Sequence, residues 1–100
     1  MARAVHVISH KAIREYKAAR PDAESGLDNW YRAATSGKWN NFVELKKEFG
    51  SADWVWPYVV FNIAGNKYRL IAEINFRSQT LFIRHIPTHA EYTQGKWKKS

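Results

Sequence analysis

The stretch from residue 58 to residue 92 constrains the fold of this 100-residue chain more than any other part of it. It holds three segments with strand-like patterning, separated by two short turn sequences, and it ends in a group of His, Arg and Tyr side chains. Strands joined by such tight turns pair as antiparallel neighbours. We therefore expect a three-stranded antiparallel sheet here, with the preceding half of the chain as its cover.

The first two predicted strands differ in the faces that they bury. Tyr58–Ile63 is almost continuously apolar, as expected for a strand that is covered on both faces. Ala64-Gly65-Asn66 follows as a hairpin turn, because Gly and Asn tolerate positive φ. Residues 68–76 then alternate between apolar and polar side chains, so one face of this strand is core and the other is charged. The polar set is Arg69, Glu73, Asn75 and Arg77.

The third predicted strand spans residues 80–86 and is ended by the following proline, which has no N–H to donate to a ladder. A turn at residues 77–79 precedes it. Strict alternation along this strand places Arg84 on the face opposite to Ile83 and His85.

The first half of the chain predicts a strand and a helical hairpin. Residues 4–9 are rich in β-branched side chains, which favours a short strand beside the later ones. The spacing of apolar residues predicts a helix over residues 10–20, with Ser9 as its N-cap. A second helix over residues 23–35, capped by Asp22, follows after a tight link, so the two helices form an antiparallel pair that lies on the sheet.

Residues 39–49 carry apolar side chains at helical spacing, and Asn40 or Asn41 can cap a short helix there. Adding this third helix, we expect a single domain over residues 1–100. Its fold class is α+β, with an N-terminal strand, a helical hairpin and then the three-stranded antiparallel sheet.

The segment 52–57 is ambiguous. We interpret its two tryptophans, Trp54 and Trp56, as packing residues that cover the edge of the sheet. Stacking on a nucleobase is the alternative role for either ring.

The charge of the chain limits its partners. Sixteen Lys and Arg against nine Asp and Glu give a formal net charge of +7, and a domain this basic is typical of proteins that bind a polyanion. The chain has no cysteine, which excludes disulfides and thiolate metal ligands. No apolar run approaches the roughly 20 residues of a membrane span, and the first residues lack the pattern of a secretory signal, so we expect a cytoplasmic protein.

Several kinds of site are disfavoured by the motifs of the chain. The four histidines lack the spacing and the carboxylate neighbours of a zinc site. There is no Gly-rich phosphate loop, no Gly-x-Ser-x-Gly elbow and no pair of carboxylates suited to glycoside hydrolysis. We therefore expect no metal and no cofactor.

The predicted sheet instead offers basic, aromatic and imidazole side chains that suit RNA cleavage without a metal. The reaction needs a base for a 2′-hydroxyl, cations for the charge that grows on the phosphate, and an acid for the departing 5′-oxygen. His serves as base or acid near neutral pH, and Arg grips phosphate oxygens. Tyr either has its pKa lowered by neighbouring cations or stacks on a base. The set is Lys67, Arg69, Arg77, Arg84, His85, His89 and Tyr92.

Structural alternatives exist for the members of this set. Arg69 can pair with Glu73 on the same strand face, and His85 can be a partly buried strand residue. The basic residues outside the sheet face can be phosphate contacts or simply a solvated surface. An acidic segment of a partner can also cover such a basic patch. The candidate phosphate contacts are Lys38, Lys46, Lys47, Arg77, Lys96, Lys98 and Lys99.

Thr88 and Glu91 have the spacing of a capping box, which starts a helical turn just after the last strand. Such a cap would fix the direction of His89 and Tyr92 at the end of the sheet. The two side chains can therefore be an ordinary capped turn or a catalytic pair.

At these residues the chain resembles the HigB family of toxin–antitoxin ribonucleases, within the wider RelE/ParE toxin superfamily. The segment YVVFNIAGNKYRLIAEINF carries an F-N-I-x-G-N-K-Y-R-L-I core, and LFIRHIPTHAEY carries a T-H-x-E-Y motif. The upstream segments DNWYRAA, W-x-x-F-x-E-L-K and HVIS are also similar to the family. The resemblance covers about residues 4–97.

The resemblance implies a small RelE-like fold and an mRNA endonuclease that works on translating ribosomes and halts growth. It implies a HigA-type antitoxin with a helix-turn-helix domain, and binding of operator DNA only through that antitoxin. It places Arg69 at the phosphate, and His89 and Tyr92 in the motif of catalytic or base-stacking groups. We therefore assign catalysis to Arg69, His89, Tyr92 and Arg84, and RNA binding to Lys67, Arg77, Lys46, Lys47 and Lys98.

Two other function classes fit part of the sequence. A ParE-like poison of DNA gyrase shares the fold, so architecture does not distinguish it from a nuclease. A non-catalytic nucleic-acid-binding module would need only the charge. The pairing of His89 and Tyr92 with the arginines favours cleavage, because a gyrase binder has no need of an acid–base pair.

Overall fold

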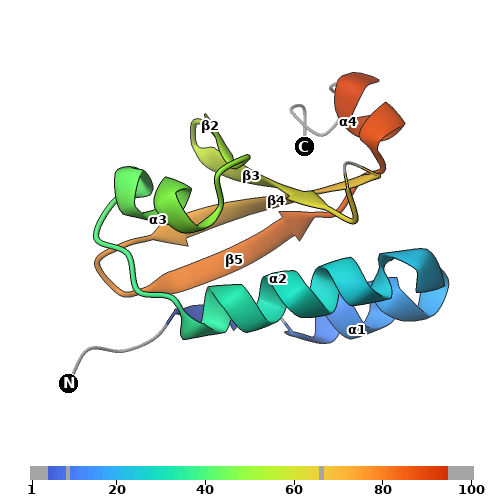
Figure 1. Ribbon diagram of the computed structural model, residues 1–100, viewed down its shortest axis with the longest axis horizontal. Coiled ribbons are helices and arrows are strands. Elements are labelled where there is room, and N and C mark those ends of the chain that lie inside the picture. Colours follow the sequence, from blue (N-terminus) through green and yellow to red (C-terminus); the bar gives the residue numbers. More distant parts are fainter. Residues whose placement is uncertain (1–4, 9, 66, 95–100) are drawn as a thin grey trace.

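The computed structural model describes residues 5–8, 10–65 and 67–94, without the side chains of His10 and His89. Its centre is a five-stranded sheet in the order β1-β5-β4-β3-β2, with helices on one face and at both ends (Figure 1). The strands are β1 (His6–Ile8), β2 (Asp53–Val55), β3 (Tyr58–Ile63), β4 (Tyr68–Asn75) and β5 (Thr80–His85). The helices are α1 (His10–Ala19), the 3₁₀ turn η1 (Pro21–Ala23), α2 (Glu24–Ser36), α3 (Phe42–Glu48) and α4 (His89–Gln94).

The predicted α+β class is confirmed, and so is the antiparallel order of β3, β4 and β5. The predicted N-terminal strand is confirmed as β1, and the sheet is wider than predicted by one short strand, β2, at the other edge. β1 pairs with β5 in parallel, and β2 pairs with β3 antiparallel. The segment that forms β2 is ambiguous in sequence, since three residues at an edge carry little periodicity.

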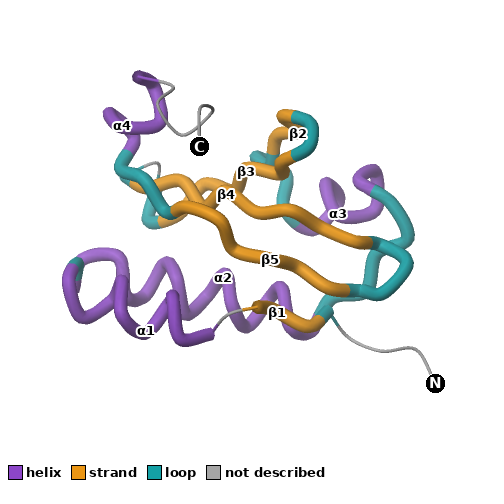
Figure 2. Tube along the Cα trace, turned by 180° about the vertical axis from the view of Figure 1, so that it is seen from behind, coloured by secondary structure: helices purple, strands orange, loops and turns teal. Residues whose placement is uncertain are grey.

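The two long helices cover one face of the sheet, as Figure 2 shows from behind. Leu27, Trp30 and Ala34 are the buried residues of α2, and the Trp30 ring meets that of Phe61 edge-on at 5.4 Å between centroids. Leu70 on β4 is fully buried in the same cluster. This cluster is the main core of the protein. None of the helices in the described part of the chain is long and apolar enough to cross a membrane.

Gly26 brings α2 close to the hairpin turn between β3 and β4. A Cβ atom at this position would lie 2.7 Å from the backbone nitrogen of Ala64 and 3.0 Å from a methyl carbon of Ile63. The turn itself has positive φ at both Ala64 and Gly65, as the hairpin prediction required for the glycine. A glycine in α2 is therefore a packing requirement of the fold.

The prediction that Asp22 caps the second helix is wrong. Ala23 occupies the N-cap of α2 and makes no side-chain cap bond. The Tyr68 hydroxyl instead donates a hydrogen bond to Asp22 Oδ1 at 2.7 Å, and this bond is the main reason that the pKa of Tyr68 is raised. The aspartate thus ties the helical hairpin to the start of β4.

The predicted third helix is confirmed as α3, and Asn41 is its cap. The Glu44 N–H donates to Asn41 Oδ1 at 3.0 Å, and the Asn40 N–H donates to Glu44 Oε1 at 2.8 Å. This reciprocal pair satisfies two N–H groups at the helix start. In Figure 1, α3 lies at one end of the sheet and α4 at the other.

Of the two tryptophans expected to pack on the sheet edge, only Trp54 does so. Its ring stacks on Phe76 at 6.4 Å between centroids and meets Phe42 edge-on at 5.1 Å. Trp56 is 76% exposed in the turn after β2, so the packing prediction is wrong for this residue.

Candidate functional site

The candidate site lies on the sheet face that points away from α1 and α2, which we call the open face. Alternation in β3 and β4 directs Val59 and Ala72 into the main core, and Val60 and Ile71 to the opposite side. Val60 and Ile71 are fully buried there and form a separate small cluster. We call these two residues the floor of the site. Three partly buried side chains pack on the floor, namely Val55, Tyr58 and Tyr92.

Tyr92 brings helix α4 onto the floor, and Arg69 lies over its ring. The guanidinium carbon of Arg69 is 5.5 Å from the centroid of the Tyr92 ring, a geometry in which the cation is attracted to the π-face. The backbone also fixes Arg69, because its N–H donates to the Pro87 carbonyl at 2.9 Å. Two of the predicted catalytic residues are therefore in contact.

The predicted capping box at the start of α4 is confirmed. The Thr88 N–H donates to Glu91 Oε1 at 2.8 Å, and the Glu91 N–H donates to Thr88 Oγ1 at 3.2 Å. The bond from the Thr88 N–H to the carboxylate is the largest cause that holds the pKa of Glu91 below its usual range, and the Thr88 side chain adds to it. The Tyr92 N–H donates to the Thr88 carbonyl in the first helical turn, so the cap orients Tyr92 above the floor.

The pKa of Tyr92 is raised. Partial burial of the phenol is the largest cause and the carboxylate of Asp53 adds to it, while Arg69 acts in the opposite direction and is the weaker influence. The phenol is therefore neutral at physiological pH. In this state it can donate a proton or stack on a base, and it is poorly suited to act as a general base.

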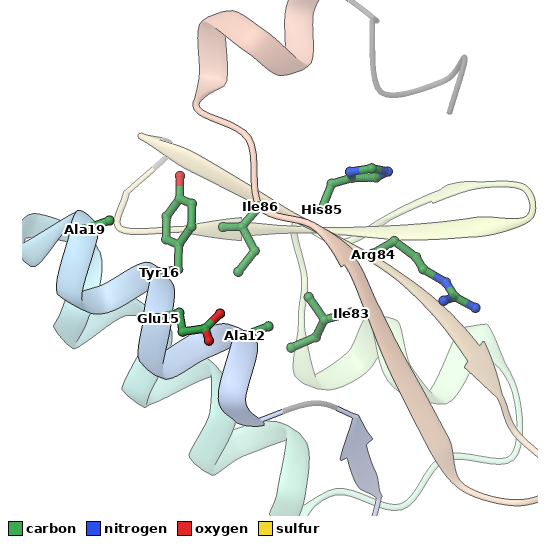
Figure 3. Close-up of a pocket in the computed structure, with 8 residues that line it drawn as sticks. All are labelled: Ala12, Glu15, Tyr16, Ala19, Ile83, Arg84, His85 and Ile86. Atoms are coloured by element: carbon green, nitrogen blue, oxygen red, sulfur yellow. The ribbon is translucent and has the colours of Figure 1, made fainter.

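An irregularity in β5 changes where Arg84 points. Ile71 pairs with His85 and Ala72 pairs with Ile83, so Arg84 is the extra residue of a β-bulge. The prediction of strict alternation is right in placing Arg84 opposite to Ile83 and wrong in placing it opposite to His85. Figure 3 shows Arg84 and His85 both directed away from α1, whereas Ile83 is directed toward it.

Arg84 is held on the open face by two contacts. Its Nε donates to Glu73 Oε1 at 3.0 Å, and its guanidinium carbon lies 5.3 Å from the centroid of the Phe82 ring. The alternative in which Glu73 pairs with Arg69 is therefore replaced by a pair with Arg84. Both side chains of this ion pair remain roughly half exposed to solvent, so Arg84 is open to an anionic ligand.

His85 and Asp53 lie at the two sides of the floor. The register pairs Asp53 with Val60, Val60 with Ile71, and Ile71 with His85, so the four residues form one row across the sheet. At a spacing of about 4.8 Å per strand, the outer two positions are roughly 14 Å apart. Asp53 is not among the predicted site residues, because the segment that forms β2 is ambiguous in sequence. The parity of a strand in that segment is the signal that could have found it.

The remaining predicted site residues do not all meet here. The side chain of His89 and the whole of Lys98 lie outside the described residues. Lys67 is exposed just before β4, at the same end of the strand as Arg69. Lys67 is therefore placed to extend the basic character of the open face.

A second basic group lies away from the floor. Arg77 lies beyond the end of β4, and the six residues from Arg69 to Asn75 alone span roughly 20 Å at about 3.3 Å per strand residue. Lys46 and Lys47 are exposed in the last turn of α3, which lies at the opposite end of the sheet from α4 (Figure 1). Lys46 also donates to the Ala52 carbonyl at 2.7 Å. These three residues are thus separate from Arg69 and Tyr92.

Metal ligands do not gather within the part of the chain that the structure describes. No group of three or more His, Asp or Glu side chains there is arranged to hold an ion. The polar groups around the floor are instead two guanidinium groups, an imidazole, two phenols and two carboxylates, one of which is paired with Arg84. This set combines positive charge with groups that can exchange protons.

A family model described as HigB toxin, the RelE-like toxic component of a toxin–antitoxin system, matches residues 23–95. The chain belongs to the HigB toxin family. The mRNA interferase toxin HigB of Escherichia coli strain K12 is 31% identical over 91 residues, which is 88% of each chain. The mRNA interferase HigB of Shigella flexneri has the same identity and coverage. That of Escherichia coli O6:H1 is 30% identical over 91 residues, again 88% of each chain.

Membership in this family confirms the resemblance noted in the sequence. The toxic component of a toxin–antitoxin system has an antitoxin as its partner. The matched segment includes β3, β4, β5 and α4, and it therefore contains every described residue of the candidate site.

Proposed function

We propose that this HigB-family toxin is an endoribonuclease that cleaves mRNA on translating ribosomes and so arrests translation. The contact of Arg69 with Tyr92 above the apolar floor is the observation that carries the proposal. It puts a permanent cation and a neutral phenol side by side on the open face of the sheet. The relatives named mRNA interferases support the choice of substrate.

The proposed reaction is attack of an RNA 2′-hydroxyl on the adjacent phosphorus, without a metal. A 2′-O–P bond forms, the P–O5′ bond breaks, and the 5′-oxygen leaves with a proton. Arg69 and Arg84 stabilise the charge that develops on the non-bridging oxygens, as preorganised cations do in a transition state. Each guanidinium group packs against a neutral aromatic ring. Part of its set of N–H donors is therefore left for phosphate oxygens.

We assign proton transfer to the imidazoles and the phenol. His85 lies on the open face beside Ile71, and His89 begins α4, so one of them serves as the base that accepts the 2′-hydroxyl proton. Tyr92, with its raised pKa, is a neutral donor for the leaving oxygen or a stacking partner for a base.

The second basic group is assigned to the nucleic acid outside the scissile site. Arg77, Lys46 and Lys47 lie too far from Arg69 to share one phosphate with it. We propose that they contact phosphates of the ribosome-bound RNA, together with Lys67 and Lys98. Binding should then weaken steeply as salt is added, because each phosphate contact releases counterions.

The proposed partner is a HigA-type antitoxin with a helix-turn-helix domain, through which the complex binds its operator DNA. We place the toxin in the cytoplasm, where ribosomes and operator are found. A small helix-turn-helix protein encoded beside this chain would support the assignment.

Expression of this toxin in growing bacteria, followed by mapping of mRNA 5′ ends, tests the activity. We expect new 5′ ends within translated regions, absent when Arg69→Ala is expressed at the same level. The purified toxin should cut a reporter mRNA with ribosomes present and cut it weakly without them. Intact transcripts together with disturbed DNA supercoiling would replace the proposal with a gyrase poison.

A further inference from the structure

A row of mostly apolar side chains crosses the open face next to the floor, one from each strand. Directly paired residues of a sheet share one face, and the register aligns Ile8, Phe82, Glu73, Tyr58 and Val55 in this row. Tyr58 and Val55 pack on the floor. Glu73, at the centre of the row, is its single charged residue.

The carboxylate of Glu73 lies on a face for which we propose RNA binding, although a negative charge repels phosphate. The Arg84 Nε donates to Glu73 Oε1 at 3.0 Å, which fixes the carboxylate and offsets its charge. The side chain of Glu73 is still 39% exposed. A carboxylate has about four lone-pair sites, so the bond from Arg84 leaves capacity for further donors from a ligand.

A nucleobase can supply such donors, because proteins recognise single-stranded RNA through hydrogen bonds to the exposed edges of its bases. Guanine presents its N1–H and its 2-amino group side by side, and these match the two oxygens of a carboxylate. The Watson–Crick edges of adenine, cytosine and uracil each place an acceptor next to a donor. That acceptor would face a carboxylate oxygen, so a fixed carboxylate favours guanine.

The β2–β3 hairpin adds aromatic rings beside Glu73. Tyr58 is its neighbour on β3, and Trp56, in the turn between β2 and β3, is 76% exposed. Splayed bases of single-stranded RNA stack on rings of this kind. On the other side of Glu73 lies Arg84, to which we assign the reacting phosphate. A base held at Glu73 would therefore be next to the site of cleavage.

We propose that Glu73 recognises a guanine of the mRNA beside the scissile phosphate. Its carboxylate accepts hydrogen bonds from the N1–H and the 2-amino group, and the base packs against the rings of the β2–β3 hairpin. Arg84 holds the carboxylate through Nε and directs its other donors to phosphate. Glu73 is thus a specificity-determining residue. This inference rests on the proposed function, because it concerns the RNA that the toxin cuts.

The first test uses the purified toxin and ribosomes programmed with short mRNAs. Cleavage sites are mapped, and we expect guanine to be enriched beside the cut. Inosine then replaces that guanine, which removes the 2-amino group and nothing else. We expect the cleavage rate to fall about tenfold, a discrimination typical of one bidentate contact to a base. Equal rates on the guanine and inosine RNAs would overturn the proposal.

The second test compares Glu73→Gln with Glu48→Gln, the same change at an exposed residue of α3. Glu73→Gln should cut the guanine and inosine RNAs at nearly equal rates, while Glu48→Gln should keep the preference for guanine. This preference is a ratio of two rates of one protein, so a loss of folded protein does not change it. Slowing of both RNAs by one factor, even to complete inactivity, would mean that Glu73 only orients Arg84, and the proposal would be wrong.

The mapping also separates this inference from the proposed function. If the wild-type toxin cuts mRNA with no preference for guanine, the recognition by Glu73 is refuted and the nuclease stands. If it cuts no RNA with ribosomes present, both are refuted.

Discussion

The guanidinium carbon of Arg69 lies 5.5 Å from the ring centroid of Tyr92. This contact joins the start of strand β4 to helix α4. Neither residue would be fixed by its own element alone. Arg69 is anchored through its N–H to the Pro87 carbonyl, and Tyr92 is oriented by the cap on Thr88. The proposed catalytic contact is therefore built from backbone hydrogen bonds at the end of the sheet.

Arg69→Ala should remove most of the activity and leave the fold intact. Loss of one preorganised group that stabilises transition-state charge lowers rates by about 10²–10³-fold, whereas loss of an exposed cation–π contact costs only about 0.5–1 kcal/mol of stability. Reporter mRNA cleavage and thermal unfolding would be measured in parallel. Arg77→Ala, at the other end of the sheet, is the matched control and should lower cleavage much less. Equal losses for both arginines would mean that general RNA affinity and not the site was affected.

The pKa of Tyr92 should respond in opposite directions to its two charged neighbours. Asp53→Asn removes a negative charge and should lower the pKa, while Arg69→Ala should raise it further. Because the folded-state pKa is raised above the ordinary value of 10.0, the resulting stability is present below pH 10 and is lost as the pH rises through the folded pKa. NMR titration of the isotopically labelled phenol carbon would measure the pKa of Tyr92 in each variant, with Glu48→Gln on α3 as the control. A Tyr92 pKa unchanged in Asp53→Asn would contradict the described geometry.

The capping box should make α4 sensitive to acid. The pKa of Glu91 is lowered from the ordinary 4.5, so its stabilising effect is present above pH 4.5 and is lost as the pH falls through the folded pKa. Amides of α4 should then exchange faster in acid. Thr88→Ala should produce the faster exchange already at neutral pH, since losing such a cap costs about 1 kcal/mol, and it should weaken cleavage by displacing Tyr92. An α4 that exchanges equally fast in both proteins would show that the cap does not hold the helix.

Gly26→Ala should destabilise the protein although alanine is the better helix former. Alanine favours a helix interior by about 1 kcal/mol over glycine, but the added methyl would lie 2.7 Å from the Ala64 nitrogen. Overpacking of this kind costs about 1–3 kcal/mol, so we expect a net loss in urea unfolding. Gly50→Ala is the control, because a Cβ there meets no atom within 4 Å. A stabilised Gly26→Ala protein would show that the hairpin turn yields to the methyl group.

Much of this architecture could be predicted from the sequence, because the signals were local. Periodicity located the helical pair and the β3–β4–β5 meander, and side-chain spacing identified the caps at Asn41 and at Thr88. These features depend on residues three or four positions apart. The approach of Arg69 to Tyr92 was anticipated only as nearness at one end of the sheet.

The features that could not be predicted depend on partners distant in the chain. Asp22 is bound by a tyrosine 46 residues away and therefore does not cap its own helix. The bulge at Arg84 arises from the register between two strands, and no residue type in β5 marks it. Strand parity alone predicts that Arg77 lies with Arg69, although the length of β4 is enough to separate them.

The two faces of the sheet contribute unequally to stability. The large buried side chains lie with α1, α2 and α3, while the floor beneath the proposed site has only Val60 and Ile71 fully buried. Point mutations on the open face can therefore silence the toxin without unfolding it. In a bacterial population, a silenced toxin of this kind would persist as an intact protein and, where its antitoxin contacts are unchanged, would still compete with active copies for antitoxin.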